Sequence, residues 1–369
     1  MKKITFTLFV YLCFVSLINA QDVTTFFDGT PDDAIVVDSN GNIYCSNYVG
    51  DSVFKFTPEG VGTAFITGLI TPNGLAINSN NELFVCDGQG NRIYKYDLDG
   101  NLITFYNHLG HPSGIIKSPN SDAMIFTEYL GNKINMISST GIVTEISSAP
   151  QLAGPVGIAF DENDNLYVGN YNNRTIYKVL PNGDLDFVAL LPNEGGTIPN
   201  LGFITYAQGR IWATIMGNNK IYMVNPNGIN DFEVFAGSSQ GGADGDISIA
   251  TFNTPNGITF NDAEDTMYVT DFGTKNLRII SNIALSNEEF ELDNRLIQIF
   301  PNPVKDKIKI QTFEAIDIEV VRLYNLEGKL VSEQHTPSHE IDLSSMMAGV
   351  YFIEISTNKG VVNKKIIKD

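Results

Sequence analysis

Side chains able to bind a metal ion or a polar ligand recur at two positions of a repeated sequence unit. The first position follows the second predicted strand of a unit, and it carries an amide or a carboxylate at Asn47, Asp87, Glu128, Asn170 and Asp271. In four units an aromatic residue comes next, at Tyr48, Tyr129, Tyr171 and Phe272. Carboxylate and amide oxygens suit Ca²⁺, and together with aromatic rings they also suit sugars or polar peptides. These residues form the predicted ligand-binding set.

The second position opens the first predicted strand of a unit, close to the expected centre of the fold. It carries an acid or an amide in most units, and the candidate metal ligands there are Asp32, Asp33, Asn73, Asn200 and Asn256. A structural explanation competes with this one, because Pro-Asn-Gly forms a good turn without any ligand. The carboxylates after the second strand could likewise hydrogen-bond to the loop between strands. The sequence leaves both explanations open and assigns no catalytic residue.

Short apolar stretches separated by Gly, Asn, Asp or Pro make up each unit, which predicts β-strands joined by turns. The units begin at Pro31, Pro72, Pro112, Pro155, Pro199 and Pro255, and their period of about 40 residues is typical of β-propellers. We therefore expect an all-β chain with a six-bladed β-propeller. The sixth unit has no fourth strand of its own, and residues 23–29 are expected to supply it. Because strands within a blade run antiparallel, the two candidate positions share one face of the propeller.

The segment FAGSSQGGADGDISIATFNTPNGITF at residues 235–260, with MYVTDFGTKNLRII after it, resembles the NHL repeat. The resemblance covers about residues 23–282, and the gluconolactonase-like six-bladed propellers are similar as well. In that group a divalent cation in the channel, held by a Glu, by Asn residues and by an Asp, polarises a lactone or ester carbonyl. The resemblance implies that Asp32 or Asp33 replaces the glutamate here. It also implies Ca²⁺ as a cofactor, with amides from Asn73, Asn200 and Asn256.

The last part of the chain has a different pattern of alternating strands, which predicts a small C-terminal β-sandwich. Four motifs there, PNPVKDKIKI, LYNLEGKLV, IDLSSMMAGVYFIEI and KKIIKD, resemble the type A C-terminal sorting domain of the type IX (Por) secretion system. This resemblance implies export through a Bacteroidota-type outer-membrane system, with the secretion machinery and a sortase as partners of residues 296–369. The polar and acidic residues 283–295 are expected to form a linker after a propeller domain at residues 21–282.

Residues 1–20, MKKITFTLFVYLCFVSLINA, combine two lysines with an apolar stretch and are predicted to be a secretory signal peptide. An uncleaved anchor helix is the competing interpretation, but the apolar stretch is only about 15 residues long and a membrane-spanning helix needs about 20. We expect no transmembrane segment later in the chain. The formal net charge of −19 opposes binding to nucleic-acid phosphates. The expected location is extracellular or on the outer-membrane surface, reached through the periplasm.

Two functions remain open at this point. The first is non-catalytic binding of a glycan, a peptide or a protein on the polar face of the propeller. The second is Ca²⁺-dependent hydrolysis of a lactone or ester, of the gluconolactonase type. Zinc chemistry is disfavoured, because His108 and His111 bracket one loop and a zinc site would need further ligands of the right type beside them.

Overall fold

The structure of this chain is a computed structural model. It describes residues 21–107, 110–195, 200–283, 297–312, 316–325, 329–335, 339–357 and 360–369. The predicted signal peptide at 1–20 and nearly all of the predicted linker at 283–295 lie outside the described residues. The chain divides into two compact units, residues 1–285 and residues 286–369. No helix among the described residues has the length and apolar character needed to cross a membrane.

Five sheets of the first unit contain four strands each, in chain order. The first sheet has β2 (Ile35–Val37), β3 (Ile43–Ser46), β4 (Val53–Phe56) and β5 (Gly62–Ile66). The second has β6 (Pro72–Ile77), β7 (Glu82–Asp87), β8 (Arg92–Asp97) and β9 (Leu102–Asn107). The third has β10 (Pro112–Lys117), β11 (Met124–Glu128), β12 (Lys133–Ile137) and β13 (Val143–Ser147).

The next two sheets follow the same plan. The fourth has β14 (Pro155–Phe160), β15 (Leu166–Asn170), β16 (Thr175–Val179) and β17 (Leu185–Leu190), and the fifth has β18 (Leu201–Ala207), β19 (Arg210–Ile215), β20 (Lys220–Val224) and β21 (Phe232–Ala236). Their second strands are buried along nearly their whole length, as in Leu166–Asn170. A sheet that is covered on both faces buries the side chains on both faces. For this reason burial does not alternate from one residue to the next along these strands.

The sixth sheet combines the two ends of the unit. Its order is β22 (Gly245–Asp246), β1 (Asp22–Asp28), β25 (Asn276–Ser281), β24 (Thr266–Asp271) and β23 (Pro255–Phe260). The first strand of the chain, β1, pairs antiparallel with β25, with Val23 opposite Ile280 and Asp28 opposite Asn276. It therefore takes the outer place that the sixth sequence unit leaves empty.

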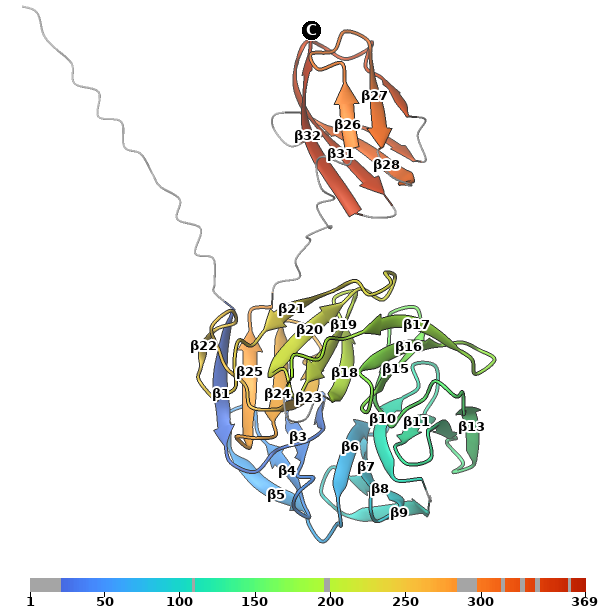
Figure 1. The fold of residues 1–369 in the computed structure, drawn as a ribbon, viewed down its shortest axis with the longest axis vertical. Helices are drawn as coiled ribbons and strands as arrows, with labels where there is room; N and C mark the ends of the chain where they lie inside the picture. Colours follow the sequence, from blue (N-terminus) through green and yellow to red (C-terminus); the bar gives the residue numbers. More distant parts are fainter. Residues whose placement is uncertain are drawn as a thin grey trace, which may run out of the picture. The chain divides into compact units, whose positions relative to one another are not determined.

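The innermost strands contact one another in turn, from β2 through β6, β10, β14 and β18 to β23, and β23 contacts β2 again. Figure 1 shows these sheets following one another around a common centre. The first unit is therefore a β-propeller with six blades among its described residues. The glycine of each Pro-x-Gly motif permits this close approach. A Cβ at Gly74 would lie 1.9 Å from the Ser113 carbonyl oxygen of the next blade, and one at Gly257 would lie 2.0 Å from that of Asp33.

The second unit consists of two sheets that share one core. The smaller sheet has the order β26 (Ile297–Phe300), β27 (Lys307–Thr312) and β30 (Glu340–Asp342). The larger sheet has the order β29 (Leu330–His335), β28 (Ile318–Tyr324), β31 (Gly349–Thr357) and β32 (Gly360–Lys368). Alternate residues such as Ile308, Leu323 and Ile353 are buried between the sheets, which is the pattern of a β-sandwich.

Candidate functional site

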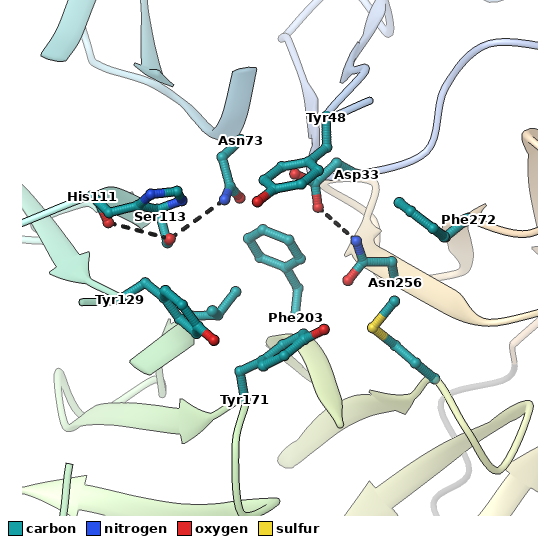
Figure 2. A pocket seen from close by; sticks show the side chains of 12 residues that line it. Asp33, Tyr48, Asn73, His111, Ser113, Tyr129, Tyr171, Phe203, Asn256 and Phe272 are labelled. Atoms are coloured by element: carbon teal, nitrogen blue, oxygen red, sulfur yellow. Dashed lines mark hydrogen bonds between the residues drawn. The ribbon is translucent and has the colours of Figure 1, made fainter. Parts of the chain in front are cut away.

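A ring of large side chains surrounds a cavity of about 180 Å³ on the axis of the propeller. We call this cavity the axial pocket; its lining is Asp33, Tyr48, Asn73, His111, Ser113, Tyr129, Val156, Tyr171, Phe203, Met216, Asn256 and Phe272. The four aromatic residues that the sequence placed after the second strands of different blades all reach it (Figure 2). Tyr129 and Tyr171 meet edge to face, with ring centroids 5.8 Å apart, an arrangement that aromatic pairs favour.

The two remaining blades complete this rim differently. In the fifth blade Met216 follows β19, at the position where four blades carry an aromatic residue. In the second blade the equivalent residue is Gly88, and the imidazole of His111 occupies the space beside it. A Cβ at Gly88 would lie 2.5 Å from His111 Nε2. Met216 and His111 are pocket residues that the sequence analysis did not identify, although the glycine in one unit and the methionine in another were visible signals.

Burial lowers the pKa of His111, although the carboxylate of Asp87 opposes that change. The neutral imidazole is therefore favoured at neutral pH. The ring packs against Tyr129, with centroids 5.7 Å apart, and His111 itself adopts a left-handed backbone conformation with φ of 59°. This conformation is uncommon for residues other than glycine and is enriched for His, Asn and Asp. A neutral imidazole at the wall of a cavity can accept a proton or a hydrogen bond through one nitrogen and donate through the other.

The floor of the axial pocket holds the polar residues at the start of the first strands. Asn256 Nδ2 donates to Asp33 Oδ1 at 2.6 Å, and Asn73 Nδ2 donates to Ser113 Oγ at 3.4 Å (Figure 2). The second oxygen of each group, Asp33 Oδ2 and Asn73 Oδ1, is buried and has no hydrogen-bond partner among the described residues. Buried polar atoms normally have a partner, so these two atoms mark a place where a ligand can bind.

Burial raises the pKa of Asp33 well above its usual value, and the neighbouring carboxylate of Asp32 raises it further. The opposing effects of Asn256 and Lys275 are smaller. The ionised form of Asp33 is thus disfavoured, and a protonated Asp33 can donate a hydrogen bond through Oδ2 while Asn73 Oδ1 accepts one. The pocket floor offers one donor and one acceptor.

The carboxylates and amides at the ends of the second strands do not line the axial pocket. Asp87 Oδ1 accepts the backbone N–H of Thr71 at 2.8 Å. Asn170 Oδ1 accepts that of Ala153 at 3.0 Å, and Asp271 Oδ1 accepts that of Asn253 at 2.7 Å. The remaining two members of this set bond within their own blades, Asn47 to the Gly50 amide and Glu128 to Asn135 Nδ2.

Each of the three backbone donors lies just before the first strand of the same blade. The side chain after the second strand therefore holds the loop that leads to the pocket floor. These contacts agree with the structural explanation given in the sequence analysis, in which the carboxylates and amides hydrogen-bond to a loop. The aromatic residue that follows in the sequence is the one that lines the axial pocket.

The fifth blade differs from its predicted alignment. Leu201 pairs with Ile215, as Pro72 pairs with Asp87 in the second blade, so Asn200 lies one residue before the strand. Its Nδ2 donates to the Tyr171 carbonyl at 3.1 Å, and Asn200 is not part of the pocket lining. The predicted equivalence of Asn200 with Asn73 is wrong, because the strand register is shifted. The fifth blade contributes Phe203 to the channel instead.

The predicted Ca²⁺ ligands fit a metal site poorly. Asp32 accepts the Tyr48 amide at 2.6 Å and forms an ion pair with Lys275, so it faces away from the cavity lining. Of the described residues, no group of three His, Cys, Asp or Glu side chains is placed to hold a metal ion. Asp33, Asn73 and Asn256 remain, which supply two amides and one carboxyl group whose ionised form burial disfavours. Calcium prefers six to eight oxygen ligands, with carboxylates among them, so these three residues form an incomplete calcium site.

Comparison with known proteins gives two family matches. Residues 17–250 match the Virginiamycin B lyase family, and residues 298–369 match the Secretion system C-terminal sorting domain. None of the curated proteins compared matches this chain.

Several solved structures are similar to this chain. Virginiamycin B lyase from Staphylococcus aureus is 23% identical with a TM-score of 0.51, over 68% of this chain and 80% of the other. A gluconolactonase from Xanthomonas campestris is 16% identical with a TM-score of 0.56, over 70% of this chain and 89% of the other. A protein of unknown function from Bacteroides thetaiotaomicron is 16% identical with a TM-score of 0.61, over 71% and 76%. Likenesses at these identities show the fold.

Proposed function

Because this chain belongs to the Virginiamycin B lyase family and ends in a secretion-system sorting domain, we propose that it is an exported propeller that binds its ligand in the axial pocket. The sorting domain indicates secretion by the type IX system to the cell surface or the extracellular space, and it implies contact with that machinery. The ligand we propose is a glycan, a peptide or a protein, of which one uncharged, ring-sized polar group enters the cavity. The chain acts in this proposal as a binding module.

The observation that carries this proposal is the combination of an aromatic rim with two unpartnered polar atoms on the pocket floor. Aromatic rings offer large apolar faces at a low entropic cost, and a few placed polar groups fix the orientation of a ligand. Asp33 Oδ2 and Asn73 Oδ1 are such groups. The cavity volume of about 180 Å³ is below the roughly 300–1,000 Å³ of pockets that enclose a whole small molecule. It therefore suits a terminal group of a larger ligand.

Isothermal titration calorimetry of residues 21–369 against a panel of methyl glycosides, oligosaccharides and uncharged tripeptides tests this proposal. We expect saturable binding for at least one class, and a loss of affinity of tenfold or more in Tyr48→Ala and in Tyr171→Ala. Tyr177→Ala is the matched control, since Tyr177 is half-buried on β16, where it packs on Phe187 away from the pocket. Binding that survives both pocket substitutions would refute the proposal, as would the absence of binding to the entire panel.

A second candidate function is catalysis of lactone or ester cleavage in the same pocket. The observation that favours it is the presence of two titratable groups, Asp33 and His111, whose environments shift their pKa values in opposite directions. An acid with a raised pKa and a base with a lowered pKa in one cavity are groups that general acid–base catalysis can use. The expected metal-dependent form of this activity has less support, because the donor set for Ca²⁺ is incomplete.

Turnover of gluconolactone and of virginiamycin B, with and without CaCl₂ or EDTA, tests the second candidate. These substrates are taken from the activities for which the similar proteins are named. Activity that disappears in His111→Gln and Asp33→Asn and persists in Tyr177→Ala supports catalysis. An absence of turnover, together with ligand binding that depends on Tyr48, leaves the binding module as the function.

A further inference from the structure

Two buried oxygen atoms on the floor of the axial pocket restrict which ligand group can bind there. Asp33 and Asn73, which carry these atoms, are 3% and 6% exposed, and both line the pocket. Asn256 Nδ2 donates to Asp33 Oδ1, so Asp33 Oδ2 is the oxygen without a partner. Ser113 Oγ donates to the His111 carbonyl at 3.4 Å and therefore accepts from Asn73 Nδ2. Asn73 Oδ1 is thereby an acceptor without a donor.

The surroundings of Asp33 favour a hydrogen-bond donor at Oδ2. Lys275 forms its ion pair with Asp32, and none of the described residues that line the pocket is a Lys or an Arg. A buried carboxylate without a paired cation is costly, and the adjacent carboxyl group of Asp32 adds repulsion. The ionised form is therefore disfavoured, and the protonated acid has a donor at Oδ2. The pocket floor thus matches a ligand group that has one acceptor and one donor.

A secondary amide is an uncharged group with this chemistry. Its carbonyl oxygen accepts and its N–H donates, and in the trans form the two point to opposite sides of a planar unit. It can therefore bond on its two sides to Asp33 and Asn73, which belong to adjacent blades. Phe203, Val156 and Met216 supply apolar surface in the same lining. All three are buried, so a methyl group beside the amide would be removed from water there.

The shape of the pocket favours an amide that hangs from a ring over one within a chain. Phe203 lines both the axial pocket and the cavity among the innermost strands, and Figure 2 shows its ring in the middle of the pocket side chains. The ring therefore lies at the inner end of the pocket, where a main-chain amide that continues in both directions fits less well than a side group. Tyr48, Tyr129 and Tyr171 line the pocket as well. Their apolar faces and hydroxyl groups suit a sugar ring, which has C–H faces and hydroxyl edges.

This inference rests on the axial pocket being the ligand site. We propose that its ligand is a glycan that contains an N-acetylated amino sugar, whose acetamido group reaches the pocket floor. The acetamido N–H donates to Asn73 Oδ1, its carbonyl oxygen accepts from Asp33 Oδ2, and its methyl group packs against Phe203. The sugar ring lies among the tyrosines of the rim. Side chains of Asn and Gln also end in an amide, so peptides that carry them are the competing ligands in the test.

Isothermal titration calorimetry of residues 21–369 with matched methyl glycosides tests the proposal without any substitution. The glycosides of N-acetylglucosamine and glucose form one pair, and those of N-acetylgalactosamine and galactose form the other. Within each pair the ligands differ in an acetamido group against a hydroxyl. We expect saturable binding of at least one N-acetylated glycoside, with an affinity about tenfold or more above that of its partner, because the partner leaves a buried polar atom unpaired.

The outcomes separate this proposal from the function of the axial pocket. Equal affinities within a pair, or tighter binding of the tripeptides Gly-Asn-Gly or Gly-Gln-Gly, would overturn the acetamido proposal and leave the pocket as a ligand site. Failure of all four glycosides to bind would also overturn it. The proposed binding function itself fails only if the whole panel of oligosaccharides and tripeptides fails as well.

Substitutions on the pocket floor locate the acetamido group. Asp33→Leu and Asn73→Leu each remove one partner of the amide, and each should lower the affinity for the N-acetylated glycoside about tenfold or more. Asp33→Asn restores a donor and should recover part of the affinity lost in Asp33→Leu. Asn78→Leu is the matched control, because Asn78 is also 6% exposed but follows β6 at its other end, outside the pocket lining, and should leave the affinity unchanged. Unchanged affinity in Asn73→Leu, or an Asp33→Asn variant as weak as Asp33→Leu, would contradict the assigned hydrogen bonds.

Discussion

The contribution of Asp271, at the end of β24, to the stability of the propeller depends on whether its carboxyl group is ionised. Its side chain is 0% exposed, and it accepts the Asn253 amide at 2.7 Å and the Thr274 hydroxyl at 2.9 Å. Arg278 Nη1 lies 3.8 Å from its Oδ2. Burial raises the pKa of Asp271 to about 7, although the bonds from Thr274 and the Asn253 amide and the charge of Arg278 oppose this change. The ionised form is therefore disfavoured in the folded protein.

The effect on stability follows from the difference between the folded and unfolded pKa values, about 7 and 3.8. Below pH 3.8 the carboxyl group is protonated in both states. Between the two values the unfolded chain releases the proton while the folded protein retains it, so the free energy of unfolding falls as pH rises. Each unit of pKa corresponds to about 1.36 kcal/mol. The unmodified chain should thus lose about 4 kcal/mol relative to Asp271→Asn over the whole titration, about 3 kcal/mol of it between pH 4 and pH 7, and the difference should level off near pH 8.

Urea unfolding of both chains at pH values from 4 to 8 measures this difference. Trp212 is the only tryptophan of the sequence and lies in β19, so its fluorescence reports on the propeller and not on the sorting domain. Other titrating groups, including Asp33 and His111, are present in both chains and cancel in the comparison.

Asp265→Asn is the control for a carboxyl group that should not titrate in this range. Hydrogen bonds from Asn261 and Thr266 lower the pKa of Asp265, so its contribution to stability changes only below pH 3.8 and this variant should differ from the unmodified chain by a nearly constant amount from pH 4 to 8. A difference for Asp271→Asn that is as flat from pH 4 to 7 as that for Asp265→Asn, or that changes in favour of the unmodified chain as pH rises, would show that Arg278 outweighs burial and would refute the reasoning.

Three further predictions concern how the propeller is held together, and each is measured by the same tryptophan fluorescence. Deleting residues 22–28 removes the strand that pairs with β25 and should lower Tm and broaden the transition; an unchanged Tm would mean that the ring is stable when open. Lys275→Met leaves the buried carboxylate of Asp32 without its cation. Because the lysine is one-third exposed, we expect the free energy of unfolding to fall by about 1–2 kcal/mol, less than the roughly 3–5 kcal/mol lost when a fully buried pair is broken. Adding Asp32→Asn should recover part of this loss. Gly74→Ala places a methyl group 1.9 Å from the Ser113 carbonyl and should cost about 1–3 kcal/mol or more; a neutral effect would show that the neighbouring blades can move apart.

The repeated pattern of the sequence was sufficient to predict the fold. Each unit buries its strands against its neighbours, so every copy must keep the same apolar positions, turns and glycines, and the period becomes visible. The all-β propeller was predicted correctly for this reason, and the sorting domain was predicted correctly from its four motifs. The register of the fifth blade could not be predicted, because Asn200-Leu201-Gly202 imitates the Pro-Asn-Gly turn of the second and sixth units. Strand pairing places these residues differently.

The candidate site was predicted in part. The aromatic position after each second strand reaches the axial pocket because every blade directs that residue toward the axis. The adjacent carboxylates and amides share the same periodicity, but they bond to backbone amides such as that of Thr71. Periodicity cannot distinguish a side chain that lines a cavity from one that holds a loop. His111 was missed because it fills a gap left by Gly88, and such compensation between loops depends on three-dimensional proximity.

The pairing of β1 with β25 has a consequence for how the protein is made. A nascent chain can finish five sheets as it emerges, while the sixth keeps an open seam between strands separated by some 250 residues of sequence. An unpaired edge is a template for strands of other molecules. Premature termination anywhere before β25 would therefore leave the first strand without its partner, and such fragments should associate with one another. The ring can therefore close only in a chain whose synthesis has passed β25.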